Sequence, residues 1–416
     1  MTNNSGESIA HALAAWAIDL VPTADDLRLA EAALRDTLAT SVGAMSDAGV
    51  RPVVEELSRP AALGALAHWT DYDDLHVPST THISAVCVPA TLASGGAADA
   101  YLAGAGVMAR LGVAMGWNHY TSGWHATSTI GPAGAAAVAS RAFALDAEAT
   151  AHAISLAVAS AGGVQRVFGT AGKPVQVGFA VEAGLRAARL ARAGVRTDPS
   201  SVEDWMRLAG GDASAVDLSG PAVPGGLAVK LSSCCYALQR PIHVTRMLRV
   251  DEPDPAAIQS IVVRAPRAAV APLHHHDPQT ASEAKFSLEY ATAVSLLAPA
   301  TEPLPFTEEW VDAPEVRRLM GLVRFEATAD EGVGLLVGGH EVELVLSSGE
   351  THRAEDDSAP GAPDRPVSQQ QLLAKIADCC GDLAGAVAHA GWDTAAAVID
   401  RAARERHGLE LEAASL

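Results

Sequence analysis

Two histidines and two lysines that stand shortly before predicted helices carry the clearest chemical signal in the sequence. They are His82, His125, Lys173 and Lys230. The start of a helix presents free N–H groups and a partial positive charge, so each position could bind an anion, and the adjacent cation would strengthen that binding. If the four helix starts converge, they form a pocket for carboxylates. If they do not, they are ordinary helix-start residues on the surface.

The residues that follow predict where these helices begin and end. Ser84 is expected to open the first of them, and the second is expected to open near Pro132. Pro174 suits the first position of the third helix, because a proline lacks the N–H that this position leaves unbonded. Lys173 then lies at the helix entrance, and Gly194 is placed to end the helix.

The elements that must position these residues are mainly helical. Apolar residues recur at spacings of three and four over 8–57, 84–115, 134–146, 175–194, 368–391 and 392–408. Strand patterns are confined to 258–266, 321–330, 332–339 and 340–355, with a helix expected over 282–297. We therefore expect a mainly α protein, with a large helical domain over 1–233 that resumes at 359–416 and a smaller α/β domain over 234–358.

Several stretches of the sequence resemble the MmgE/PrpD family, and they run in the family's order from the first helices almost to the C-terminus. The most specific are GWHATSTIGPAGAAA and EAKFSLEYA, and others are LRDTLATSVGA, THISAVCVPATLA and KLSSCCYALQRPIH. The resemblance implies a large all-helical domain built from both chain ends, a smaller α/β lid and a homodimer. It also implies an active site between the domains that uses no metal and no organic cofactor.

Motif by motif, the resemblance places Asp71, His82, His125, Lys173, Lys230 and Tyr290 on the family's active-site positions. Cys235 falls where some members carry a histidine. The implied chemistry is removal of a proton next to a carboxylate, for which a histidine is a suitable base near neutral pH. We expect His125 to be the base and His82 the acid or second base. Lys173 and Lys230 would bind carboxylates and stabilise the enediolate.

Two of the remaining assignments leave alternatives open. Asp71 is expected to orient a histidine or lysine, although it could be an ordinary loop cap. Tyr290 could bind a carboxylate or protonate a leaving hydroxyl, or it could belong to the core with its hydroxyl satisfied.

Three positions depart from the family pattern. Gln176 and Gln239 stand where the family often has histidine, and we place both among the substrate-binding residues together with Lys230 and Cys235. Leu75 stands where a threonine is known in the decarboxylase branch. These changes remove titratable groups and a hydroxyl from the region of the pocket, so they leave the substrate and the reaction branch open.

Composition excludes several classes of function. The chain has 416 residues and a net charge of −20, which argues against a nucleic-acid partner or an anionic membrane surface. It shows no secretion signal and no apolar run long enough to cross a membrane, so a cytoplasmic location is expected. Five cysteines, an odd number, do not form a disulfide framework or a zinc motif. The consecutive His274, His275 and His276 are not expected to bind a metal, since neighbouring side chains cannot converge on one point.

The sequence therefore predicts a cofactor-independent lyase that acts on a small di- or tricarboxylic acid. Dehydration is the first choice, and epimerisation or decarboxylation is the alternative within the class. A different class is a catalytically idle protein that binds a carboxylate, which the glutamines at 176 and 239 would favour.

Overall fold

The computed structural model describes residues 8–251, 253–299, 303–329, 332–335, 337–409 and 411. Within these residues the chain forms two compact units. Unit 1 comprises the described residues of 1–166, 171–228 and 368–416, and unit 2 comprises those of 167–170 and 229–367. The units therefore change over at 228/229 and 367/368, whereas the sequence-based boundaries stand at 233/234 and 358/359. The expectation of a mainly α protein is confirmed.

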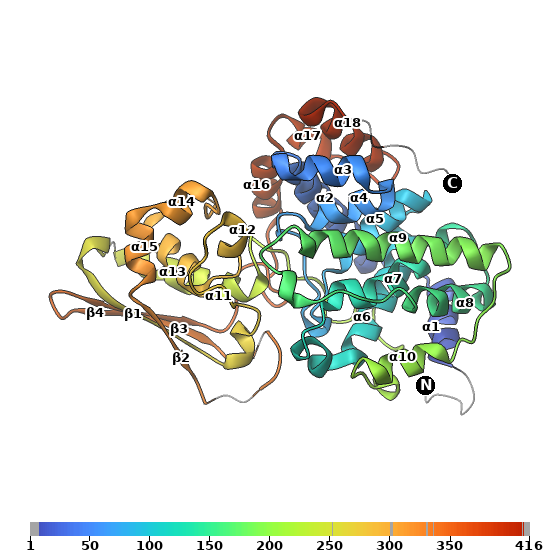
Figure 1. Cartoon of the computed structure of the whole chain (residues 1–416), viewed down its shortest axis with the longest axis horizontal. Helices are drawn as coiled ribbons and strands as arrows, with labels where there is room; N and C mark the ends of the chain where they lie inside the picture. Colours follow the sequence, from blue (N-terminus) through green and yellow to red (C-terminus); the bar gives the residue numbers. More distant parts are fainter. Residues whose placement is uncertain are drawn as a thin grey trace. The chain divides into compact units, whose positions relative to one another are not determined.

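Unit 1 is helical, and helices from early and late in the sequence pack together in it. Its α-helices are α1 (Ile9–Asp19), α2 (Ala24–Ala44), α3 (Arg51–Glu56), α4 (Arg59–His68), α5 (Ile83–Ser94), α6 (Ala98–Thr121), α7 (Ala126–Ala142), α8 (Ala147–Val158), α9 (Gly172–Arg192), α10 (Ser201–Leu208), α16 (Gln369–Cys380), α17 (Ala384–Ala388) and α18 (Ala395–His407). The C-terminal helices α16, α17 and α18 contact α2 from the start of the chain, as the red and blue helices of Figure 1 show.

Unit 2 contains a four-stranded sheet with helices. The strands β1 (Ile258–Ala265), β2 (Val323–Ala327), β3 (His340–Leu346) and β4 (Thr351–Asp356) lie in the order β2-β1-β3-β4. The first pair is parallel and the other two are antiparallel. The helices of the unit are α11 (Gln239–Met247), α12 (Ala281–Ala284), α13 (Leu288–Leu297), α14 (Glu308–Asp312) and α15 (Pro314–Met320).

Short 3₁₀ helices connect these elements in both units. They are η1 (Ala48–Val50), η2 (Val77–Ser79), η3 (Gln165–Val167), η4 (Ala213–Ala215), η5 (Tyr236–Leu238), η6 (Leu248–Asp251), η7 (Pro255–Ala257), η8 (Arg267–Val270) and η9 (Gly381–Leu383).

Small side chains let the central helices of unit 1 approach closely. A Cβ atom placed on Gly178 of α9 would lie 2.3 Å from the carbonyl oxygen of Ala61 in α4. A Cβ atom on Gly184 of the same helix would lie 2.5 Å from Ala135 Cβ in α7. Neither distance is tolerable, so glycine is required at both crossings. Because α4, α7 and α9 pack this closely, the ends of these helices are held in fixed positions.

Four predictions about elements are wrong. Helix α7 begins at Ala126 and carries Pro132 in its interior, and α9 begins at Gly172, two residues before Pro174. The helix expected over 282–297 is two helices, since Ser287 caps a new start with its side chain. The described residues of 332–339 form turns and irregular chain instead of a strand.

Candidate functional site

The site residues of unit 1 come from one loop and the ends of four helices. His68 is the last residue of α4, and the loop that follows it carries Asp71 and Asp73. His82 and His125 are the residues directly before α5 and α7, and Lys173 is the second residue of α9. The contacts of α4 with α5 and α9, and of α7 with α5 and α9, bring these positions together.

One carboxylate oxygen serves two imidazole rings. Asp73 Oδ2 lies 2.8 Å from Nδ1 of His68 and 2.9 Å from Nδ1 of His82. All three side chains are buried, and that of Asp73 is fully so. A carboxylate can only accept, so the hydrogen bond to His68 places the proton of that ring on Nδ1. The Nε2 atom of His68 makes no hydrogen bond within the described part of the chain.

The second carboxylate joins a histidine to a lysine. Asp71 Oδ2 lies 2.9 Å from Lys173 Nζ, and Oδ1 lies 3.7 Å from His82 Nε2. The backbone of Asp71 has a φ of 53°, the left-handed conformation that aspartate tolerates better than most residues. Asp71 therefore contacts both a histidine and a lysine, and its expected role in orienting them stays a prediction.

The three imidazole rings pack against one another. The ring centroid of His68 lies 4.4 Å from that of His82 in an edge-on arrangement and 5.6 Å from that of His125 in a stacked one. Two backbone contacts fix the helix starts. The N–H of His125 donates to the carbonyl of Gly163, and the N–H of His82 donates to Thr127 Oγ1 in α7.

The electrostatic environment lowers the pKa values of His68, Asp73 and His125 for different reasons. Burial lowers the pKa of His125 well below its usual value, and the neighbouring His68 and Lys173 lower it further. Burial also lowers the pKa of His68, although Asp73 opposes this effect. Burial alone would raise the pKa of Asp73, but the two imidazoles outweigh it and hold this pKa well below the usual range. At neutral pH the site therefore contains an ionised Asp73 and a neutral His125.

Four residues of this region were not expected from the sequence. They are His68, Asp73 and the charged pair of Asp36 and Lys375. His68 and Asp73 stand in the polar segment HWTDYDD, five residues apart, and that spacing across a helix end was the available signal. Lys375 lies 2.6 Å from Asp36 and more than 300 residues from the loop that it contacts, so no local pattern pointed to it.

Four of the residues expected in the site belong to unit 2. They are Lys230, Cys235, Gln239 and Tyr290. Lys230 is fully buried and Cys235 is 7% exposed. Gln239 accepts from the backbone N–H groups of Leu231 and Ser232, so it holds the chain next to Lys230. Substrate binding by Gln239 stays a prediction.

Tyr290 is fully buried, and its hydroxyl donates to the carbonyl of Pro305 at 2.7 Å. Burial raises the pKa of its hydroxyl well above the ordinary value. This contact fits the alternative in which Tyr290 belongs to the core.

Gln176, in the second turn of α9, lies beside the start of α7. Its Oε1 is 3.4 Å from Ser128 Oγ, and its Nε2 is 3.4 Å from the carbonyl oxygen of Val164. The amide therefore bridges α7 and the chain before η3 at long hydrogen-bond distances, in the neighbourhood of His125.

One group among the described residues has the composition of a metal site. His68, Asp71, Asp73 and His82 each offer an atom, and these atoms lie within 4.8 Å of one another. The ammonium of Lys173 lies 2.9 Å from Asp71, however, and a cation bound there would be repelled by it. The donor set therefore fits a metal poorly.

His274, His275 and His276 have separate partners. Their ring nitrogens lie near the carbonyl of Pro272, the carbonyl of Phe168 and the carboxylate of Glu289.

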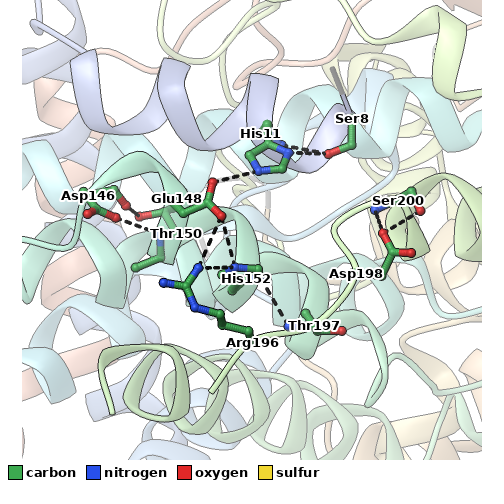
Figure 2. A network of polar contacts seen from close by, with 11 residues as sticks. Ser8, His11, Asp146, Glu148, Thr150, His152, Arg196, Thr197, Asp198 and Ser200 are labelled. Atoms are coloured by element: carbon green, nitrogen blue, oxygen red, sulfur yellow. Dashed lines mark hydrogen bonds and ion pairs between the residues drawn. The ribbon is translucent and has the colours of Figure 1, made fainter. Parts of the chain in front are cut away.

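A second polar cluster, shown in Figure 2, joins α1 to α8. Glu148 lies 3.1 Å from His11 Nε2, 3.3 Å from His152 Nε2 and 3.5 Å from Arg196 Nη1. His152 Nδ1 also accepts from the N–H of Thr197. Glu148 is half exposed and Arg196 is exposed, so this cluster tethers helices and does not enclose a ligand.

No helix within the described ranges has both the length and the apolar character that crossing a membrane requires.

Two known protein families match most of the chain. The MmgE/PrpD N-terminal domain family matches residues 57–208, and the MmgE/PrpD C-terminal domain family matches residues 232–400. The chain is 26% identical to the cis-aconitate decarboxylase of Homo sapiens over 366 residues, which are 81% of this chain and 74% of that protein. It is also 26% identical to the cis-aconitate decarboxylase of Mus musculus over 273 residues, 61% of this chain and 54% of that protein.

Proposed function

This chain belongs to the MmgE/PrpD family, and we propose that it is a lyase that removes the α-proton of a small di- or tricarboxylic acid. The observation that carries the proposal is the buried cluster of three imidazoles, two carboxylates and one ammonium in unit 1. Groups of this kind rarely share a buried space unless their protonation is used.

The chemistry explains why such a cluster is needed. Removing a proton next to a carboxylate moves an electron pair into an enediolate, which concentrates negative charge on two oxygens. The protein must supply a base that is unprotonated at neutral pH, an acid and at least one fixed cation. The cluster contains candidates for all three roles.

We assign the base to His125 and the acid to His82, because their environments differ. His125 has Lys173 and two imidazoles as neighbours, and these disfavour its charged form. His82 lies near both carboxylates of the cluster, which stabilise a proton on its ring. Two titratable groups whose surroundings favour opposite protonation states are suited to act as base and acid.

Lys173 is the proposed cation for the substrate carboxylate and the enediolate. Lys173 is 5% exposed, and its ammonium has Asp71 as an ion-pair partner. The carboxylate of Asp71 would hold the ammonium in place while an anionic substrate approaches. Lys230 remains a proposed second cation. Tyr290 is not assigned a proton transfer, since its hydroxyl already donates to a carbonyl.

Dehydration is the first choice of reaction. After His125 takes the α-proton, the β-carbon–oxygen bond breaks, the electron pair of the enediolate forms the carbon–carbon double bond, and His82 protonates the departing hydroxyl. The enzyme returns to its starting state when His125 releases its proton to solvent and His82 takes one up from solvent. No cofactor is required for this balance.

Decarboxylation is the second candidate, because the two curated relatives are named cis-aconitate decarboxylases. In this reaction a carbon–carbon bond breaks, carbon dioxide leaves, and the electron pair is protonated at carbon by an acid, for which His82 is the candidate. Epimerisation would require His82 and His125 to act as two bases on opposite faces of one carbon.

The experiment incubates the protein with a panel of di- and tricarboxylates in D₂O and follows deuterium uptake and product formation by NMR. We expect uptake at the α-carbon that falls about 10²–10⁴-fold in His125→Ala. Loss of water or of carbon dioxide distinguishes the two reactions. The control is His276→Ala, because the side chain of His276 is 76% exposed and lies outside the cluster. Saturable binding without deuterium uptake would instead support an idle carboxylate-binding protein.

A further inference from the structure

A buried lysine from the C-terminal segment reaches the loop that carries the two site carboxylates. Lys375 of α16 is 3% exposed, and its Nζ atom donates to the carbonyl oxygen of Tyr72 at 2.7 Å. The same atom lies 2.6 Å from Asp36 Oδ1 in α2 and 4.1 Å from the centre of the Tyr72 ring. The ammonium is thus held between α2 and the loop.

The position of Tyr72 gives this contact its significance. Tyr72 stands between Asp71 and Asp73, so its carbonyl belongs to the peptide unit that leads into Asp73. The same loop is tied down further along by Leu75, which exchanges two backbone hydrogen bonds with Ala228. Directly before Tyr72 the backbone of Asp71 has the unusual φ of 53°, a conformation that persists only where the surroundings enforce it.

We infer that Lys375 is a positioning residue for the proposed reaction, because its ammonium fixes the Tyr72 carbonyl and so aims the carboxylates of Asp71 and Asp73 at their partners. The inference rests on the proposed function for its link to catalysis. It does not require Lys375 to touch the substrate, and its expected effect reaches the reacting atoms through Asp71 and Asp73.

The groups around Lys375 are consistent with this role. Asp74 is buried beside the pair and accepts a hydrogen bond from Ser84 Oγ at 2.5 Å. Burial and the nearby Asp36 raise the pKa of Asp74 to about 8, so it is protonated at neutral pH. The carboxylate of Asp36 therefore balances the charge of the Lys375 ammonium. Another N–H of the same ammonium donates to the Tyr72 carbonyl.

The test uses two double variants that carry the same charge. In Asp36→Asn/Lys375→Met the pair is neutral and the donor to Tyr72 is lost. In Asp36→Asn/Lys375→Gln the pair is neutral, but an amide N–H remains to donate to the carbonyl. Neutralising both partners together avoids leaving an unpaired buried charge, which would be strongly destabilising. Both double variants lack the Asp36 carboxylate, so the glutamine variant also serves as the control for its loss.

Two readouts are compared in the full-length protein. The first is the rate of deuterium uptake by the carboxylic acid that the wild type exchanges, which we expect to fall about 10- to 100-fold in the methionine variant and to recover at least in part in the glutamine variant. The second is the nitrogen NMR spectrum of the histidine rings. The wild type should show His68 protonated on Nδ1, and the methionine variant should show a mixture of tautomers.

The outcomes separate the two proposals. Equal rates and unchanged ring spectra in the two double variants would overturn the positioning role, as would equal losses in both. If the wild type exchanges no acid in the panel, the proposed function fails, while the ring spectra still decide whether Lys375 orients the carboxylates. If the methionine variant does not fold, Lys375→Arg, which retains the charge and changes the donor geometry, is measured in its place by the same two readouts.

Discussion

At the scale of single residues, the properties of the site follow from the protonation states of Asp73 and His125. Asp73 remains ionised because two imidazoles donate toward one of its oxygens, and His125 remains neutral because burial and nearby cations oppose its protonation. A neutral imidazole in such a position can accept a proton from carbon. The ionised carboxylate keeps a second imidazole in one orientation.

The pH dependence of the reaction should report the lowered pKa of His125. A base must be unprotonated, so kcat/KM falls when the pH drops through the pKa of the base in the free enzyme. Because burial lowers the pKa of His125 well below 6.5, the acid limb of the profile should have its midpoint clearly below pH 6.5. The measurement is kcat/KM from pH 4.5 to 8. A midpoint at 6.5 or above would contradict the assignment of His125 as base.

The stability of the protein should report the raised pKa of Asp74. Its pKa is about 8 in the folded protein and 3.8 in the unfolded chain, so the folded state holds a proton that the unfolded state releases between these values. Asp74 therefore makes the protein less stable as the pH rises from 4 to 8. Replacing it by asparagine removes this effect, so the stability of Asp74→Asn relative to wild type should increase by about 1.4 kcal/mol per pH unit.

Urea unfolding of both proteins at pH 5, 6 and 7 measures this difference. The comparison with wild type cancels the contributions of the other buried groups, among them Asp73, whose lowered pKa acts in the opposite direction at lower pH. A difference that stays constant across the three pH values would show that Asp74 is ionised in the folded protein.

Four of the buried residues that the structure brings together in unit 1 were expected from the sequence. His82, His125 and Lys173 precede or open helices, and the family resemblance pointed to Asp71. His68 and Asp73 were missed although they are equally buried. A histidine at the end of an apolar helix has the pattern of a core residue, and only the fold shows that its ring meets two others.

At the scale of elements, the helices could be predicted and their exact starts could not. Pro132 indicated a helix start, but it is inside α7. A proline costs one backbone hydrogen bond inside a helix, and the close packing of α7 against α9 offsets that cost. The position of the true start matters for the site, because it places His125 directly before α7 instead of seven residues away from it.

Replacing Gly184 by alanine should loosen the contact between α7 and α9. The added Cβ would lie 2.5 Å from Pro132 O and from Ala135 Cβ, so the helices must move apart. We expect a loss of about 1–3 kcal/mol in the free energy of unfolding, measured with urea. The control is Gly385→Ala in α17, where a Cβ meets no atom within 4 Å. There alanine should stabilise the helix by up to about 1 kcal/mol. A Gly184→Ala protein as stable as wild type would contradict the close packing.

At the scale of the whole molecule, the chain makes one helical unit from two distant segments and a second unit from the residues between them. The sequence-based boundaries stand at 233/234 and 358/359, whereas the two units change over at 228/229 and 367/368. The order of the strands did not follow from the sequence, because β1 pairs with both β2 and β3 and such pairings join residues far apart in the chain. The homodimer implied by the resemblance stays a prediction, which the mass in solution will check.

The cysteines should be unreactive in the folded protein. All five are free thiols, and four of them are buried. Burial raises the pKa of both Cys379 and Cys380 to about 12, so little thiolate is present at neutral pH. We expect iodoacetamide at pH 7.5 to label the native protein slowly and to label five positions after denaturation, as counted by mass spectrometry. Rapid labelling of several thiols without denaturant would contradict the buried positions of these side chains.

The distance along the chain between Lys375 and the loop that it contacts has a consequence for biosynthesis. Their hydrogen bond spans 303 residues, so the partner of Tyr72 leaves the ribosome about 15–60 s after Tyr72 itself at ordinary rates of translation. Throughout that interval the nascent protein holds Asp36 without its ammonium. The loop that carries Tyr72 can therefore reach its final form only after residue 375 has left the ribosome.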